Sequence, residues 1–401
     1  MSIKRRDSKN RVLRTGESQK KDGRYMYKYT DNEGKIKYVY SCKLVSTDPV
    51  PQCSKDDIAL RDKIKQIQKD LADGIVSNGG DYTVYELVKK YISQKTGVRH
   101  NTMANYHFVL NILKNDDFGK MRIDKVRVSD AKAWFIKLQA EGRGYSSIHA
   151  IRGVVNPAFK LAVSDDLIRK NPFDFQLTTV VVNDSKKREA LTDEQLQAFL
   201  DFVKNDKHFK RYYEGVYILF HTGMRISEFV GLTMDDIDLD KGIIDINHQL
   251  QRKRNMEYVI ESTKTTCGTR RVPMTDDVKE CFKTIINNRK APTHEPVIDG
   301  IQGFLYLDKN DMPMVALHWE KYFEHICEKY NKTHDVKLPR VTPHICRHTF
   351  ITQMARSSMN PKILQQIVGH SEISITLDVY THLGFDDIQQ EMQRINNATT
   401  L

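Results

Sequence analysis

The side chains best suited to chemistry lie in four short patterns between residues 221 and 380. Each pattern joins a turn, strand or helix start to a cationic residue, and they follow in the order His221–Glu228 (HTGMRISE), Ser262–Pro273 (STKTTCGTRRVP), Thr342–Phe350 (TPHICRHTF) and Ile367–His370 (IVGH). The second pattern suggests two strands joined by a turn, with a lysine at its edge. Tyr380 comes ten residues after the last pattern. Because His344 and Arg347 are three residues apart, a helix there would put both on one face.

Together the patterns could form one cation cluster beside a tyrosine, made of Arg225, Lys264, His344, Arg347, His370 and Tyr380. Such a cluster suits a phosphate whose non-bridging oxygens gain negative charge in the transition state. Arginine binds phosphate through two parallel hydrogen bonds and keeps its proton. A tyrosine hydroxyl can attack the phosphorus and form a covalent phosphoenzyme, while a lysine at a turn could protonate the departing alkoxide.

Taken singly, these residues also have ordinary structural explanations. Arg225 could form a salt bridge at a helix start, Lys264 could be a solvated turn residue, and Tyr380 could be a packing residue. Only the joint occurrence, in this order and spacing, favours the catalytic interpretation. The five cations already supply the charge that Mg²⁺ would bring, and the patterns hold no pair of acidic residues to bind one. We therefore expect no metal and no other cofactor.

The motif set resembles that of the tyrosine recombinases, the phage-integrase family. The resemblance is strong over about residues 190–382 and weaker over 82–175, and it is carried by Arg225 in TGMRISE, His344 and Arg347 in HICRH, His370 in GH, and Tyr380. Two departures, Cys346 and Val368 in place of the usual Leu, leave apolar side chains there.

The resemblance implies a site-specific DNA recombinase that integrates and excises a mobile element. Tyr380 would attack a phosphodiester to give a 3′-phosphotyrosyl bond, and the two arginines would clamp the non-bridging oxygens. The two histidines would hydrogen-bond the phosphoryl group, and Lys264 would protonate the departing 5′ oxygen. A second strand would then reverse the step without ATP or metal.

The first 45 residues carry most of the excess positive charge. They hold 13 Lys or Arg against 5 Asp or Glu, a net +8 out of the +11 of the whole chain. Alternation over residues 24–29 and 35–40 predicts a hairpin whose turn uses Gly34 at positive φ, with Val12 and Leu13 as a third strand. This region is similar to the three-stranded arm-binding domain of integrases from conjugative transposons that carry antibiotic resistance. A small sheet with solvated lysines is the alternative.

Beyond the break at residues 49–51 the pattern is helical. We expect one helix from Asp56 to about Ile75. Four more are expected over residues 82–170, the first with a capping box, the second over about 101–114, the third from Ser129 and the fourth over about 146–164, with Pro157 inside it. The turns at 97–101 and 143–146 place basic side chains at helix starts, where a phosphate can bind. Each could also simply be a solvated turn.

These features predict a mixed, multidomain chain. We expect an α+β arm-type DNA-binding domain with a connecting helix (1–75), an all-α four-helix core-binding domain (80–175), a linker (176–190), a mainly α catalytic domain with a small β-sheet (191–382) and a helical tail (383–401). Strands are expected near 242–247, 258–262 and 270–273. The predicted DNA-binding residues are Arg5, Arg6, Arg24, Tyr27, Lys28, Lys37, Tyr38 and Tyr40 near the N-terminus, and Lys95, Arg99, His100, Asn101, Arg143 and Ser146 in the helical region.

The tail carries one apolar stripe, formed by Phe385, Ile388, Met392 and Ile395. A helix this short needs a docking surface to be stable. It could pack on its own domain, whereas the family resemblance favours a neighbouring protomer. The expected partners are therefore double-stranded DNA, at core crossover sites and separate arm sites, a homo-tetramer on two duplexes, and an accessory excision factor.

The composition limits the class of protein further. The 401 residues are 39% hydrophobic and 29% charged, which is ordinary globular composition, and the net +11 favours nucleic acid over a membrane as partner. The six cysteines form no CxxC pair, and the apolar runs fall short of the ~20 residues that cross a bilayer. We expect a bacterial cytoplasmic, nucleoid-associated protein.

Three other functions compete with recombination. A type IB topoisomerase uses similar residues to nick and close DNA, and a non-enzymatic DNA-binding regulator would need only the basic surface. A metalloprotein could be built on His344, Cys346, His348 and His370. The last is disfavoured because residues two apart point to different faces of a helix.

Overall fold

The computed structural model describes residues 5–31, 34–49, 58–72, 82–185, 189–253, 255–263 and 266–380, together with residues 389, 392, 393 and 396. The chain divides into two compact units, Met1–Lys186 and Lys187–Leu401. Across these described ranges, no helix is long and apolar enough to cross a membrane.

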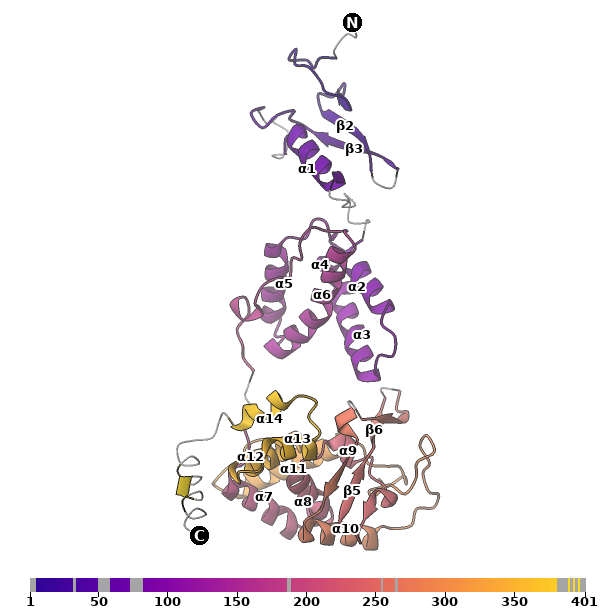
Figure 1. Ribbon diagram of the computed structural model, residues 1–401, viewed down its shortest axis with the longest axis vertical. Coiled ribbons are helices and arrows are strands. Elements are labelled where there is room, and N and C mark those ends of the chain that lie inside the picture. The colour runs from indigo at the N-terminus through magenta and orange to yellow at the C-terminus, as the bar shows by residue number, and fades with distance from the viewer. Residues whose placement is uncertain are drawn as a thin grey trace. The chain divides into compact units, whose positions relative to one another are not determined.

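The N-terminal part of the first unit is a three-stranded antiparallel sheet packed on one helix (Figure 1). Its strands, in the order β1-β2-β3, are β1 (Glu17–Gln19), β2 (Tyr25–Thr30) and β3 (Ile36–Ser41). The predicted hairpin is confirmed, and Gly34 has φ +79° as expected. The predicted third strand is wrong, because Val12 forms only an isolated bridge with Arg6.

The true third strand was missed because its residues are polar. Glu17 is 1% exposed, and its carboxylate accepts hydrogen bonds from the Arg61 guanidinium at 3.2 Å. The helix α1 (Leu60–Ala72) that carries Arg61 starts later than the predicted Asp56. The backbone amides of Leu60 and Arg61 donate to the carbonyls of Lys43 and Leu44, at 2.8 and 3.1 Å, so tertiary hydrogen bonds fix the start of the helix.

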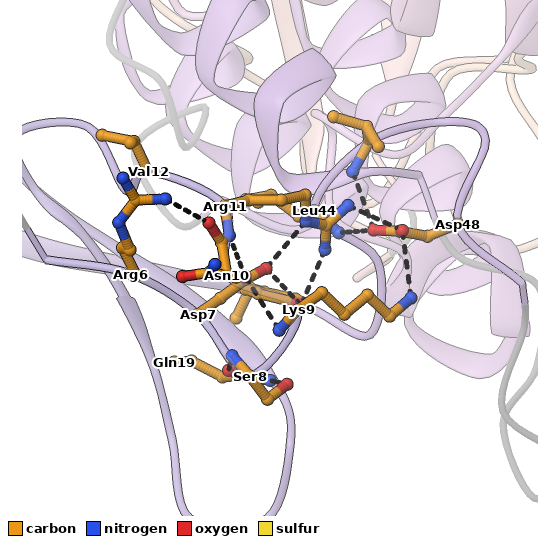
Figure 2. A network of polar contacts seen from close by, with 12 residues as sticks. Arg6, Asp7, Ser8, Lys9, Asn10, Arg11, Val12, Gln19, Leu44 and Asp48 are labelled. Atoms are coloured by element: carbon orange, nitrogen blue, oxygen red, sulfur yellow. Dashed lines mark hydrogen bonds and ion pairs between the residues drawn. The ribbon is translucent and has the colours of Figure 1, made fainter.

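A polar network ties the N-terminal loop to the end of the sheet (Figure 2). The Arg11 guanidinium donates to Asp7 and Asp48, each at 2.8 Å, and to the Tyr25 hydroxyl at 2.9 Å. Asp48 also accepts hydrogen bonds from the backbone amides of Leu44 at 2.9 Å and Val45 at 3.2 Å. Arg11 therefore stabilises the fold of this small region through its two acidic partners.

The helical part of the first unit has four long helices, as predicted, and one single-turn helix that was not. They are α2 (Val84–Ser93), α3 (His100–Asn115), α4 (Asp117–Lys120), α5 (Val128–Ala140) and α6 (Tyr145–Ser164). The predicted capping box of Thr83 and Glu86 is present, and Pro157 lies inside α6. The short α4 was missed because one turn, capped by Asp116, leaves no periodic signal.

The core of this helical region extends beyond residue 175. Leu177, in a short 3-10 turn, and Val181 are 4% and 2% exposed and pack with the helices. The first part of the segment predicted as a linker is therefore packed against the helical core.

The second unit is mainly helical with two small antiparallel sheets (Figure 1). Its helices are α7 (Asp193–Asn205), α8 (Tyr213–Thr222), α9 (Ile226–Phe229), α10 (Asp276–Asn288), α11 (Ala316–Thr333), α12 (Pro343–Arg356), α13 (Pro361–Val368) and α14 (Ile373–Tyr380). One sheet has the order β4-β5-β8, and the other pairs β6 with β7. The strands are β4 (Ile237–Asp238), β5 (Ile243–Ile246), β6 (His248–Arg252), β7 (Tyr258–Ser262) and β8 (Arg270–Pro273).

The three strands predicted in this unit are confirmed, but two of them are not partners. The pattern Ser262–Pro273 predicts two strands joined by a turn, whereas β7 pairs with β6 and β8 pairs with β5. A 3-10 turn at Thr266–Gly268 leads into β8. The lysine of this pattern, Lys264, lies outside the described residues. Of the apolar stripe predicted for the tail, only Met392 is described, and it is 62% exposed.

The network around Arg11 predicts an acid-sensitive contribution to stability. Burial opposes ionisation of Asp48, but Arg11 and the two backbone amides outweigh it and hold the pKa of this carboxyl well below its usual value. A lowered folded pKa stabilises the fold above the unfolded pKa of about 4, and the contribution is lost as the pH falls below that value. Asp48→Ala should therefore destabilise this region by about 1–3 kcal/mol at neutral pH, because it leaves buried donors unpaired.

Hydrogen exchange of the full-length chain at constant neutral pH measures the destabilisation caused by Asp48→Ala. Exchange of the amides in residues 5–49 should accelerate in Asp48→Ala. The matched control is Asp22→Ala, which removes the acid of an exposed pair with Arg24. Equal exchange in the two variants would show that the network does not stabilise this region.

Candidate active site

Arg225 lies where one helix ends and the next begins. Gly223 ends α8 with φ +62°, and a Cβ at this position would come within 2.5 Å of the Phe350 ring, so glycine is required there. Arg225 then caps α9, as the sequence predicts. Its guanidinium donates to Glu228 at 2.7 Å and to the Gly369 carbonyl at 2.9 Å. The helix-start salt bridge and the approach to the His370 segment are thus both present.

Glu228 is a buried carboxylate between two arginines. It is 2% exposed and receives hydrogen bonds from Arg225 and, at 2.9 Å, from Arg270. Burial opposes its ionisation, but the hydrogen bond and charge of Arg270 and the charge of Arg225 outweigh burial and lower the pKa of the carboxyl. Glu228 is therefore ionised and fixes the position of Arg225.

Arg347 is a buried cation without an acidic partner among the described residues. It is 4% exposed on α12, and one terminal nitrogen donates to the Gly223 carbonyl at 2.7 Å. Within the described ranges, the other terminal nitrogen has no hydrogen-bond partner. Burial, followed by the charge of Arg225, lowers the pKa of this guanidinium to about 9. An anion placed beside it would satisfy the free nitrogen and offset the charge.

His370 follows α13 and is anchored to the helix that ends at Tyr380. Its Nδ1 lies 2.9 Å from the hydroxyl of Thr376, a fully buried residue of α14. Burial, then the charges of Arg347 and Arg225, lower the pKa of the imidazole to about 4. The ring is therefore neutral at physiological pH.

One pocket joins residues that are far apart in the sequence. His344 and Arg347 of α12 line it together with His370, and its apolar wall is formed by Ile351, Ile375 and Val379. Arg225 reaches the same region through Gly369, although it does not line the pocket. Four of the six predicted catalytic residues are thus brought together.

Tyr380, at the end of α14, does not line this pocket. Its hydroxyl donates a hydrogen bond to the Met359 carbonyl, and burial raises the pKa of the phenol. The predicted nucleophile is therefore held against the loop between α12 and α13. The predicted place of Lys264 is untested, because that residue is outside the described ranges.

The cluster has the chemistry of an anion site, because two arginines meet there with few acidic side chains. Within the described ranges, no group of three or more His, Cys, Asp and Glu side chains is placed to hold a metal ion. Cys346 is completely buried, in keeping with an apolar packing role, while His344 on the same helix is exposed.

The predicted DNA-binding residues of the N-terminal sheet lie on two faces. Lys28 is the register partner of Tyr38, and Tyr38 and Tyr40 are 51% and 41% exposed. Arg24 lies with its guanidinium 5.8 Å from the Tyr40 ring. Residues of the opposite face include Tyr27, which packs against the core formed with α1, and Lys37, which pairs with Asp31 at 4.0 Å. Arg5 and Arg6 are exposed before β1.

The two predicted phosphate sites in the helical region differ. At the start of α6, the backbone amide of Tyr145 donates to the Asp184 carboxylate at 2.8 Å, so a protein anion already occupies this helix end. Ser146 contacts Ser185 at 3.1 Å, and the Arg143 guanidinium lies 5.7 Å from the Phe108 ring. At the start of α3, Arg99 is the N-cap without a side-chain cap, and it is followed by His100 and the exposed Asn101. Lys95 is also exposed.

Comparison with known proteins assigns the family. Residues 189–386 match the phage integrase family, and residues 1–71 match the DNA-binding domain of Tn916 integrase. The chain is 44% identical over 396 residues to the transposase from transposon Tn916 of Enterococcus faecalis, covering 99% of this chain and 98% of that relative. The chain belongs to the phage integrase family. The transposase from Tn1545 of Streptococcus pneumoniae is also 44% identical with the same coverage.

A solved structure supports the same assignment. The Tn1549 transposon integrase in complex with a circular intermediate DNA is 41% identical, with a TM-score of 0.74, and the match covers 78% of this chain and 99% of that one. The predicted membership of the tyrosine recombinases, the enzyme class and the mixed, multidomain fold class are confirmed.

Three residues that organise this site were not predicted. Glu228 and Arg270 stand in the patterns that drew attention to Arg225 and Lys264, but no role was assigned to them. Thr376, the partner of His370, lies six residues after it. An acid three residues after a helix-start arginine is a local signal, whereas the contact between Arg270 and Glu228 joins residues 42 apart and has none.

The neutral state of His370 can be measured. Titration of ¹³C-labelled histidine in the full-length chain should show His370 protonating near pH 4, because burial and the neighbouring cations disfavour the imidazolium. The resonance is assigned by its loss in His370→Gln. A midpoint near the ordinary histidine value of about 6.5 would contradict the buried, cation-flanked site.

Proposed function

We propose that this enzyme cuts and rejoins DNA through a 3′-phosphotyrosyl intermediate at the pocket of His344, Arg347 and His370, and thereby integrates and excises a mobile element. The observation that carries the proposal is the buried Arg347, which lines this pocket and whose second terminal nitrogen has no hydrogen-bond partner among the described residues. A phosphodiester supplies the anion that this guanidinium lacks. Its transition state carries more charge on the non-bridging oxygens and gains more from the same cations.

The two arginines clamp the phosphate in this proposal. Arg225 is preset by Glu228 and the Gly369 carbonyl, so little side-chain freedom is lost when the phosphate binds. His370, being neutral, hydrogen-bonds the phosphoryl group without adding a charge, and its contact with Thr376 orients the ring. His344, on the exposed face of α12, also reaches the phosphoryl group.

Cleavage moves the nucleophile and two protons. The Tyr380 hydroxyl leaves the Met359 carbonyl, transfers its proton to His344 and attacks phosphorus, and the bond to the 5′ oxygen breaks. Lys264 donates the proton that makes this oxygen a 5′-hydroxyl. Attack by the 5′-hydroxyl of a second strand reverses the sequence and releases Tyr380. The phosphodiester energy is kept in the covalent link, so the cycle needs no ATP.

The partners follow from the domain organisation. Residues 82–181 and the second unit would bind the core crossover site, and residues 5–72 would bind separate arm sites. The structure of the Tn1549 integrase in complex with DNA matches 78% of this chain, which supports DNA as the partner of the matching part. The match of residues 1–71 to the DNA-binding domain of Tn916 integrase supports the arm module. Exchange between two duplexes would require four protomers, joined by the C-terminal tails, with an accessory factor for excision.

Tyr380→Phe tests the chemistry. The variant should bind core DNA like the unchanged chain but form no covalent adduct with a nicked duplex in EDTA, since only the nucleophilic oxygen is lost. Tyr322→Phe, which removes another tyrosine hydroxyl of the same unit, is the matched control. An adduct that persists in Tyr380→Phe would reject the assignment of the nucleophile. Strand exchange between two duplexes separates recombination from nicking and closing by a topoisomerase.

Lys28→Ala tests the arm module. If Lys28 contacts an arm-site phosphate, its loss should lower the slope of log affinity against log salt by about one on DNA containing the element's ends. Binding to the core site should not change. Lys37 was also predicted to bind DNA, but it lies on the helix-side face of the same sheet and pairs with Asp31, so Lys37→Ala is the matched control and should retain the slope. A reduced slope on the core site, or an unchanged slope on both sites, would count against a separate arm module.

A further inference from the structure

The guanidinium of Arg270 connects three segments of the second unit. This side chain is 6% exposed on β8. Its Nε donates to the Ile367 carbonyl at 2.6 Å, Nη1 donates to the Gly268 carbonyl at 2.9 Å, and Nη2 donates to Glu228 at 2.9 Å. Each nitrogen therefore serves a different segment, and each of these segments leads to a residue of the proposed machinery.

The packing around Arg270 leaves little freedom. A Cβ on Gly369 would lie 3.0 Å from Arg270 Nη1 and 2.9 Å from the Cys267 carbonyl. A Cβ on Gly268 would lie 2.6 Å from the Thr263 side chain. The 3-10 turn at Thr266–Gly268 is thus in close contact with the end of α13 on one side and with the end of β7 on the other.

The three contacts act on three different groups. Through Glu228, Arg270 fixes the acid that orients Arg225. Through Ile367, it holds the end of α13, three residues before His370. Through Gly268, it anchors the end of the turn that follows Lys264. A planar guanidinium can hold three acceptors in one fixed geometry, whereas the ammonium of lysine cannot reproduce this fork.

We propose that Arg270 is a positioning residue for strand cleavage, which sets Arg225, His370 and the turn after Lys264 in a common register without touching the DNA. This inference rests on the proposed function and deepens it. The second pattern of the sequence then contributes two residues, Lys264 and Arg270, and Arg270 acts through its contacts with the surrounding segments.

The test compares Arg270→Lys and Arg270→Gln with Arg271→Lys in the full-length chain. Arg271 is the next residue of the same strand, but its side chain is 73% exposed and lies 3.6 Å from Asp245. The readout is the single-turnover rate of covalent adduct formation on a nicked duplex. Arg270→Lys should retain DNA affinity and lose about 100-fold in rate, the size of effect expected from a small misplacement of reacting groups. Arg271→Lys should cleave at the unchanged rate.

A double-mutant cycle separates positioning from a general loss of stability. Because the proposal routes part of the effect of Arg270 through the turn that follows Lys264, Arg270→Lys should cost a smaller factor in a Lys264→Ala background than in the unchanged chain. A duplex with a 5′-bridging phosphorothiolate, whose leaving group needs no proton, should likewise recover part of the loss. A role in stability alone predicts the same factor on both backgrounds and both substrates.

Three results would overturn the inference. They are unchanged cleavage in Arg270→Lys, equal factors throughout the cycle, and loss of fold in both Arg270 variants, measured by circular dichroism. Failure of the unchanged chain and of Arg271→Lys to form a Tyr380-dependent adduct would instead reject the proposed function. The two failures are therefore distinguishable in one experiment.

Discussion

The proposed site depends on the burial of one carboxylate. Glu228 is 2% exposed, and an ionised carboxylate so far from water is strongly destabilising unless it is paired. Its two partners, Arg225 and Arg270, also donate to the backbone carbonyls of Gly369 and Ile367. Neutralising a single charge therefore brings α9, β8 and the end of α13 together. The position of Arg225, the arginine proposed to clamp the phosphate, follows from this requirement.

The sequence predicted the charged members of the site but not their organisation. Arg225, His344, Arg347 and His370 were found because cations at these spacings have a joint chemical meaning, and the structure brings them to one region. Arg270 could not be assigned, since its contacts with Glu228 and Ile367 depend on tertiary packing and leave no periodic signal. Tyr380 was predicted as a nucleophile, yet its contact with Met359 belongs to a conformation that no spacing encodes. Lys264 stays a prediction.

The fold was predictable where hydrophobic periodicity was strong. The long helices of residues 82–164 and the strands β2 and β3 follow the pattern closely, because each buries one apolar face. β1 was missed because Glu17 is buried through its ion pair with Arg61 rather than through apolar contact. The sequence also could not tell which face of the sheet is covered, because that depends on where α1 packs. Tyr27 and Tyr38 look alike in an alternating aromatic pattern, but Tyr38 is exposed whereas Tyr27 is partly buried against the core formed with α1.

Charge pairing distinguishes the arginines that build this protein from those proposed to bind its substrate. Arg11 of the basic N-terminus and Arg61 of α1 are both occupied by buried acids, so the number of basic residues overstates the positive surface available to DNA. Arg270 is occupied in the same way. Arg347 is equally buried but has no acidic partner among the described residues, and its lowered pKa records the unfavourable free energy of that state. An anion that binds only the folded protein stabilises it by mass action. Phosphate binding at Arg347 should therefore stabilise the packing of α12, which carries His344, against the segment that carries His370.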